Sequence, residues 1–138
     1  MTASSDVRIF LSSTFLDMVQ ERKAIQSMVL PYLQNLANER QIHLSLIDLR
    51  WGLDNISSNS VSSCLEEVGK ATYFIGMFGD RYGFSACTQQ SETEGERVSK
   101  YIREGLQDAV QSNPALRSIQ QWAGLENRSV TELEVRCV

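Results

Sequence analysis

The strongest constraint on the fold is a short apolar run near the N-terminus, with the hydroxyl residues and helical pattern that follow it. Residues 7–11 read Val-Arg-Ile-Phe-Leu, and Ser12, Ser13 and Thr14 come next. β-Branched and aromatic residues bounded by small polar ones predict a strand, a tight loop and a helix N-terminus. If the strand is central in a parallel sheet, this loop lies at the carboxyl edge. Open α/β sheets bind ligands there, and helix N-termini there offer free N–H groups to anions.

Apolar residues at helical spacing predict a long helix over residues 14–38. Thr14, with Asp17 three residues later, resembles a capping box with a shorter acid. Pro31 lies inside the pattern and should kink or split the helix just before it. We interpret the charged residues 21–23 as a solvated face of this helix.

Residues 42–49 predict a second strand, and their alternation of polar and apolar residues is typical of a sheet edge. We expect His43 at the surface or facing a partner. After this strand, Asp48, Arg50 and Trp51 place a carboxylate, a guanidinium and an indole at the same carboxyl edge as the hydroxyl loop. Two interpretations stay open: an Asp–Arg pair with the indole covering the sheet edge, or a ligand wall that stacks a ring and holds an anion.

A third strand is predicted over residues 71–78, which are apolar on both faces, as expected of a central parallel strand. Gly79, Asp80 and Arg81 follow it and form a second polar loop at the carboxyl edge. Between the second and third strands we expect a loop over residues 54–60 and a helix over residues 60–70.

Cys64 lies on the apolar stripe of that helix, which indicates a small core residue. A further helix is predicted over residues 96–111, ended by the Asn-Pro pair that follows. A short helix is expected over residues 115–122, and residues 85–95 read as a polar loop.

The last helix is predicted to begin just after Ser129, because Ser129 and Glu132 have the spacing of a capping box. Glu132 therefore has a structural role. Glu134 faces another side of the helix and has no such role. The sequence stops inside this helix, from which we expect a fragment of a longer multidomain chain.

Composition narrows the function classes. Hydrophobic residues make up 42% and charged residues 22%, as in ordinary globular domains. The net charge of -4 does not suit a general nucleic-acid binder. The three cysteines and the single histidine lack metal-ligand spacing, so no metal site is expected. No apolar stretch reaches the length of a membrane span, and no signal peptide is evident, so we expect a cytoplasmic protein without membrane contact.

Several motifs, in order, resemble the uncharacterised domain found near the N-terminus of large NACHT/WD-repeat proteins, nephrocystin-like proteins and telomerase-associated TEP proteins. The motifs that carry the resemblance are IFLSSTFLDM (9–18), DLRWG (48–52), CLEE (64–67), FIGMFGDRYG (74–83) and SVTELE (129–134).

That family resembles the TIR domain. The resemblance implies a three-layer, flavodoxin-like α/β fold with a mostly parallel central sheet. It would form one domain over residues 7–138, after a disordered lead-in of residues 1–6. The last strand and helix of a complete TIR fold are missing. The implied parent is a STAND-type protein of innate immunity, whose oligomerising core clusters an N-terminal signalling domain that self-associates or binds protein partners.

Some TIR domains hydrolyse NAD with a glutamate on the helix after the central strand and loop. By order along the chain, the resemblance implies Glu134 as the catalytic carboxylate and Glu132 as the second choice. The substrate-binding residues it implies are Ser12, Ser13, Thr14, Asp48, Arg50, Trp51, Gly79, Asp80 and Arg81. NAD would then be a substrate and not a permanently bound cofactor. Nucleoside deoxyribosyltransferases share a hydroxyl-rich first loop and a catalytic glutamate, and they match less well.

Three hypotheses remain: a signalling domain that acts by homotypic assembly, a glycohydrolase of NAD or another nucleotide, and a purely structural role for the polar residues. For assembly, the expected surfaces are the exposed face of the first long helix and the loop over residues 54–60. In the structural hypothesis, Asp–Arg ion pairs fix the two loops and Trp51 packs against them.

Overall fold

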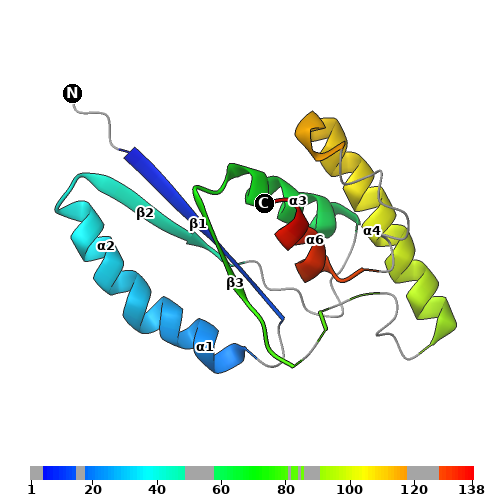
Figure 1. Cartoon of the computed structure of the whole chain (residues 1–138), viewed down its shortest axis with the longest axis horizontal. Helices are drawn as coiled ribbons and strands as arrows, with labels where there is room; N and C mark the ends of the chain where they lie inside the picture. The colour runs from blue at the N-terminus through cyan, green and yellow to red at the C-terminus, as the bar shows by residue number, and fades with distance from the viewer. Residues whose placement is uncertain are drawn as a thin grey trace.

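The chain is an α/β domain built on three parallel strands (Figure 1). A computed structural model of the 138 residues describes residues 5–14, 18–48, 58–80, 82–83, 85, 91–117 and 128–138. The strands are β1 (Ser5–Ser13), β2 (Ile42–Ile47) and β3 (Tyr73–Met77), in the order β2-β1-β3. The first apolar run is therefore the central strand of the described sheet, as predicted, and the open parallel sheet is consistent with a flavodoxin-like fold.

The register of β1 shows where the hydroxyl residues lie. β1 pairs with β2 from Ser5↔Ile42 onward and with β3 up to Ser13↔Met77. Strand β1 thus begins before the predicted residue 7, and Ser12 and Ser13 are its last two residues. The prediction of a loop beginning at Ser12 was wrong because pairing to β3 extends the strand, and strand pairing cannot be read from local sequence.

Strand β3 lies at one end of the order of the described strands. Among the described strands, β1 is its only neighbour, and the side chains of Tyr73 and Ile75 are exposed. Apolar residues on both faces of a strand predict that both faces can be packed against other elements, but they do not predict the position of the strand in the sheet. Strand order depends on which neighbours are present. Strand β2, in contrast, is the edge strand that its alternation predicted, and His43 is exposed on it.

One helical run lies on one side of the sheet, and in Figure 1 it runs alongside β2. It consists of α1 (Val19–Ala24), the π-helical turn η1 (Ile25–Val29) and α2 (Leu30–Asn38). Pro31 is in the first turn of α2, and the expected interruption takes the form of the π-helical turn just before it. A π-helical turn is one way a helix absorbs a carbonyl left without its usual N–H partner.

The other helices lie on the opposite side of the sheet in Figure 1. They are α3 (Ser58–Lys70), α4 (Glu92–Ser112), the short 3-10 helix η4 (Pro114–Leu116) and α6 (Val130–Arg136). Helix α4 begins four residues before its predicted start, because Ser91 caps it by accepting a hydrogen bond from the Glu94 N–H at 3.2 Å. The predicted helix over residues 115–122 is described only to residue 117, and its described part is η4 with the residue after it.

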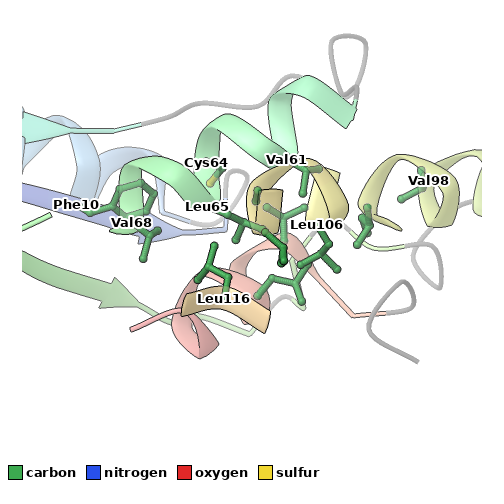
Figure 2. Packing of buried hydrophobic residues seen from close by; sticks show 13 residues of the cluster. Phe10, Val61, Cys64, Leu65, Val68, Val98, Leu106 and Leu116 are labelled. Carbon is green, nitrogen blue, oxygen red and sulfur yellow. The ribbon is translucent and has the colours of Figure 1, made fainter. Parts of the chain in front are cut away.

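The hydrophobic core lies between the sheet and this second group of helices (Figure 2). The rings of Phe10 on β1 and Phe74 on β3 stack at a centroid distance of 5.8 Å. Helix α3 contributes a stripe at helical spacing that includes Cys64, which is fully buried as predicted. The buried core residues are Phe10, Val61, Cys64, Leu65, Val68, Val98, Ile102, Leu106, Ala109, Val110, Leu116, Val130 and Leu133.

The two sides of the sheet differ in how well they are packed. On the α1–α2 side, Arg22 is the one fully buried residue of the helical run, and no apolar side chain of that run is fully buried.

No described helix is long and apolar enough to cross a membrane.

Candidate functional site

A buried polar cluster lies at the carboxyl end of β1. Ser12, Ser13 and Thr14 are all buried there. Helix α6 supplies Glu134 to this cluster, and α1 supplies Arg22. The cluster is at the sheet edge where the hydroxyl residues were expected to form a site, although Ser12 and Ser13 belong to the strand itself.

Glu134 is the central carboxyl group of the cluster. It is 5% exposed and accepts hydrogen bonds from the Ser12 hydroxyl and the Cys64 thiol, one on each carboxyl oxygen. Helix α6 presents Val130, Leu133 and Glu134 to the interior together, so its buried face carries one acidic residue. A buried carboxyl group needs such partners, because leaving it unsatisfied would cost about 1–3 kcal/mol or more.

Burial raises the pKa of Glu134 above its ordinary value, since the low-dielectric surroundings disfavour the charged form. The hydrogen bonds from Cys64 and Ser12 and the positive charge of Arg22 act in the opposite direction and only partly offset the desolvation. A carboxyl group of this kind can hold a proton at a pH where a surface glutamate has lost it, which is a common property of catalytic acids.

Arg22 is the buried cation of the cluster, contrary to the prediction of a solvated helix face. Its Nε donates to the Ser13 hydroxyl at 2.6 Å, and a terminal nitrogen donates to the Ser13 carbonyl at 2.8 Å. Its other terminal nitrogen forms an ion pair with Asp48, just after β2. Gln26, one helical turn later, donates to the second oxygen of Asp48 at 2.5 Å. The prediction is confirmed for Glu21 and Lys23, which are exposed, and was wrong for Arg22, because charge alone does not show that one residue of a helix meets an acid at a strand end.

Asp48 is therefore in the cluster, where Arg22 forms an ion pair with it and Gln26 donates a hydrogen bond to it. The predicted pairing of Asp48 with Arg50, and the predicted roles of Trp51 and Arg81, lie outside the described residues. Gly79 and Asp80 are described and are exposed at the end of β3.

The other acid of the predicted site, Glu132, is tied to the surface of the domain. Its carboxylate accepts hydrogen bonds from the Tyr82 hydroxyl at 2.5 Å and from Arg136 at 2.6 Å. The hydrogen bond from Tyr82 is the largest cause of a lowered Glu132 pKa, followed in the same direction by Arg136 and Arg128. Ser129 caps α6 by accepting from the Glu132 N–H at 3.1 Å, as predicted.

The capping box is completed by a residue from another loop. The Ser129 N–H donates to the Tyr82 hydroxyl at 3.2 Å, the position that the acid side chain would fill in a complete box. The adjacent Gly83 packs closely on the helix start, since a Cβ there would come within 2.8 Å of the Thr131 hydroxyl. The loop after β3 is thereby fixed to α6, the helix that carries Glu134.

The buried Glu134 also affects the thiol of Cys137. Burial and the nearby Glu134 carboxylate raise the pKa of its thiol to about 12, so it stays protonated at neutral pH. No group of three potential metal ligands is found among the described residues. Sequence reasoning missed Arg22, Gln26 and Tyr82 as partners of the site. The i, i+4 spacing of Arg22 and Gln26 was the one local signal available for them.

The fold and the site together define a class of protein. It is an α/β domain with a buried acid and a buried Arg–Asp pair near the carboxyl end of the central strand of the described sheet. The chain belongs to the family described as Domain of unknown function (DUF4062), whose model matches residues 8–105. It is similar to a TPR repeat-containing protein of Dictyostelium discoideum, with 34% identity over 134 residues, which cover 95% of this chain.

It is also similar to the protein named Telomerase protein component 1. The rat protein is 41% identical over 83 residues, or 58% of this chain, and the mouse protein is 40% identical over 82 residues, or 57%. The chain spans 8% of the length of the Dictyostelium protein and 3% of each telomerase component. No solved structure matches it significantly.

Proposed function

We propose that this domain is a protein-interaction module that acts by homotypic assembly, as a TIR-like signalling domain of a STAND-type protein would. The observation that carries the proposal is an apolar surface on the helical run, made of Met28, Val29, Tyr32 and Leu33. Met28 is 72% and Tyr32 64% exposed, and the other two are also exposed.

The spacing of these four residues places them on adjoining faces over successive turns of η1 and α2, so they form one surface patch. Large apolar side chains gathered on a helix surface, away from the core, are typical of a contact with another protein. The patch lies on the helix whose exposed face the sequence predicts as an assembly surface. The parallel sheet with helices on both sides also suits a TIR-like fold. The relatives are much longer proteins, one named for its TPR repeats and the other as a component of telomerase.

The test is the mass of the domain in solution over a wide concentration range, free and fused to a trimeric coiled coil, by sedimentation velocity. The wild-type chain should associate, and more strongly as the fusion. Met28→Lys should weaken association at least tenfold. Val138→Lys is the matched control, because Val138 is 74% exposed and lies after the end of α6, not on the helical run. A folded domain that stays monomeric when free and trimeric when fused would overturn the proposal.

A second candidate function is the hydrolysis of NAD to nicotinamide and ADP-ribose. The observation that favours it is the Glu134 carboxyl group against the Ser12 hydroxyl at the carboxyl end of the central strand. In this reaction the bond between nicotinamide and the ribose C1′ breaks, nicotinamide leaves with the bonding electrons, and water supplies the new C1′–O bond and releases a proton. A carboxylate beside C1′ stabilises the positive charge that develops there.

In this candidate, Glu134 is the catalytic carboxylate, and Ser12, Ser13 and Thr14 bind the phosphates. Glu132 is less suited, because it binds Tyr82 and Arg136 at the surface and does not reach the carboxyl end of β1, where Glu134 contacts Ser12. Nicotinamide release is measured for the wild-type chain, Glu134→Gln and Glu132→Gln. Turnover that is lost at least a hundredfold in the first variant and kept in the second supports the candidate. No turnover in the folded wild type, free or fused to the coiled coil, overturns it.

A further inference from the structure

The helical run of α1, η1 and α2 is attached to the sheet differently from the helices on the opposite side (Figure 1). Helix α4 buries six residues, and Val98, Ile102 and Leu106 are among those in the hydrophobic core. The run has a similar length, all of it described, and Arg22 is its one fully buried residue. Apolar burial therefore stabilises the position of this run less than that of α4. Its half-buried apolar residues are Ile25, Leu30, Leu36 and Ala37.

Polar contacts join the first half of the run to the ends of two strands. Arg22 donates to the Ser13 hydroxyl at 2.6 Å and to the Ser13 carbonyl at 2.8 Å, and it forms an ion pair with Asp48. Gln26 donates to the other Asp48 carboxyl oxygen at 2.5 Å. Further along the run, Gln34 donates to a backbone carbonyl of β2 at 3.2 Å. We call the four residues Ser13, Arg22, Gln26 and Asp48 the polar latch.

A buried ion pair and an apolar core respond differently when water reaches them. The side chains of Arg22 and Asp48 are 3% and 5% exposed. The attraction between two buried charges is largely offset by their lost hydration, and opening returns that hydration to both. Apolar side chains regain nothing of this kind in water. Regions with few buried apolar contacts also open locally at a lower free energy than global unfolding. An element held by the polar latch should thus open more easily than α4.

We infer that the helical run opens from the sheet as one unit, held closed by the polar latch, while the core beneath α3, α4 and α6 stays folded. The three segments of the run follow one another without a break from Val19 to Asn38. Opening separates Arg22 from Ser13 and Asp48. These two residues lie at the carboxyl edge of the sheet, where open α/β sheets bind ligands. The run is therefore a lid at this edge.

The inference goes beyond the proposed function, because it concerns a motion within one copy of the chain. It also connects two features of the run, which carries the apolar patch of Met28 and Tyr32 as well as Arg22. A partner that binds one of two states more tightly shifts the equilibrium toward that state. Binding at the patch and closure of the latch are linked in this way.

The first test is native-state hydrogen exchange at several urea concentrations below the unfolding transition, with peptides from α1, α2 and α4 resolved by mass spectrometry. Relative to unstructured rates, amides of the run should exchange at least about tenfold faster than the slowest amides of α4. Hydrogen-bonded amides of α1 and α2 should share one opening free energy and one urea dependence. Protection equal to that of α4, or a gradual loss from the helix ends, would overturn the inference.

A substitution in the core tests whether the run opens independently. Val98, which is 5% exposed on α4, remains packed when the run opens, so Val98→Ala should destabilise the closed and open states equally. Exchange of the run should then stay as in the wild type. Exchange of the slowest α4 amides, which requires global unfolding, should become at least about tenfold faster. An equal acceleration in the run and in α4 would mean that the run opens only when the whole domain unfolds, and would overturn the inference.

A substitution in the latch tests what holds the run closed. Asp48→Asn removes the ion pair with Arg22 and should speed exchange of the run at least about tenfold. Asp6→Asn is the matched control, because the Asp6 side chain is 74% exposed, and it should leave this exchange nearly unchanged. Equal exchange in the two variants would overturn the role of the latch. The Val98→Ala comparison does not require the latch variant to fold.

These measurements are separate from those of the proposed function, because exchange is followed at low concentration, where the free chain is monomeric. Met28→Lys, which should weaken association, should leave exchange of the run unchanged. A chain that never associates but whose run opens independently would overturn the proposed assembly and uphold the latch. A chain that associates, with a run as protected as α4, would uphold assembly and overturn the latch.

Discussion

Glu134 and Glu132 are two residues apart on one short helix, yet their surroundings have opposite effects on their charge. Glu134 faces the core, where desolvation raises its pKa, and its partners are a hydroxyl and a thiol. Glu132 faces a loop and two arginines, and these partners lower its pKa. The comparison shows that side-chain direction decides what an acid can do. Burial disfavours the charged form of Glu134, whereas Glu132 holds two segments of chain together.

The largest effect is expected from removing the cation of the buried cluster. Arg22→Met removes the ion pair with the buried Asp48 carboxylate, which should lower the free energy of unfolding by about 3–5 kcal/mol. It should also raise the pKa of Glu134 further, because a nearby positive charge is lost. Urea unfolding measures the first effect. The control is Lys23→Met, an exposed neighbour that should change stability by about 0.5 kcal/mol at most. Equal losses in both variants would mean that Arg22 has no special role.

Truncating the two acids should separate them by a smaller margin. Glu134→Ala leaves the Ser12 hydroxyl and the Cys64 thiol without their shared acceptor in the interior, at a cost of about 1–3 kcal/mol. Glu132→Ala removes surface ion pairs and should cost about 1 kcal/mol or less. The measurement is again urea unfolding, near pH 6. A larger loss for Glu132→Ala would contradict the assignment of the buried role to Glu134.

The pH dependence of stability should have opposite signs for the two acids. Folding raises the pKa of Glu134, so between its ordinary value of 4.5 and its raised value the folded state holds more protons than the unfolded state. Stability contributed by Glu134 is then full below pH 4.5 and is lost as pH rises through the raised pKa. Folding lowers the pKa of Glu132, so its contribution is present above 4.5 and is lost as pH falls through the lowered pKa.

Unfolding of the wild type, Glu134→Gln and Glu132→Gln from pH 3 to pH 8 tests these signs. Relative to the wild type, Glu134→Gln should gain stability as pH rises above 4.5. Glu132→Gln should lose less stability than the wild type as pH falls below 4.5. Parallel curves for all three chains would show that neither acid changes its pKa on folding.

The smallest effect is expected where the loop after β3 meets α6. Tyr82→Phe removes the hydroxyl that donates to Glu132 and accepts from the Ser129 N–H. Because Tyr82 is half exposed, the cost should be about 0.5–1 kcal/mol. The pKa of Glu132 should move toward its ordinary value, which NMR titration of the side-chain carboxyl can follow. An unchanged pKa would mean that the arginines alone set the charge of Glu132.

Local sequence was sufficient for the elements whose signal is local. The alternation of β2, the apolar stripe of α3 with Cys64 and the Ser129 cap of α6 were all predicted, because each depends on residues within a few positions of one another. For the site, sequence order and resemblance brought together Ser12, Ser13, Asp48 and Glu134, and the structure places all four in one buried cluster.

Contacts between distant segments required the tertiary structure. The burial of Arg22 follows from its meeting with Asp48, 26 residues away, and the tie between Tyr82 and α6 spans about 50 residues. The extension of β1 to Ser13 likewise depends on its pairing with β3. The sequence by itself determined the alternation of strands and helices and placed an acid on the last helix, because periodicity and capping are local. Only the tertiary structure decided which charges are buried and how far β1 extends, because burial and pairing depend on neighbours that the chain brings together only on folding.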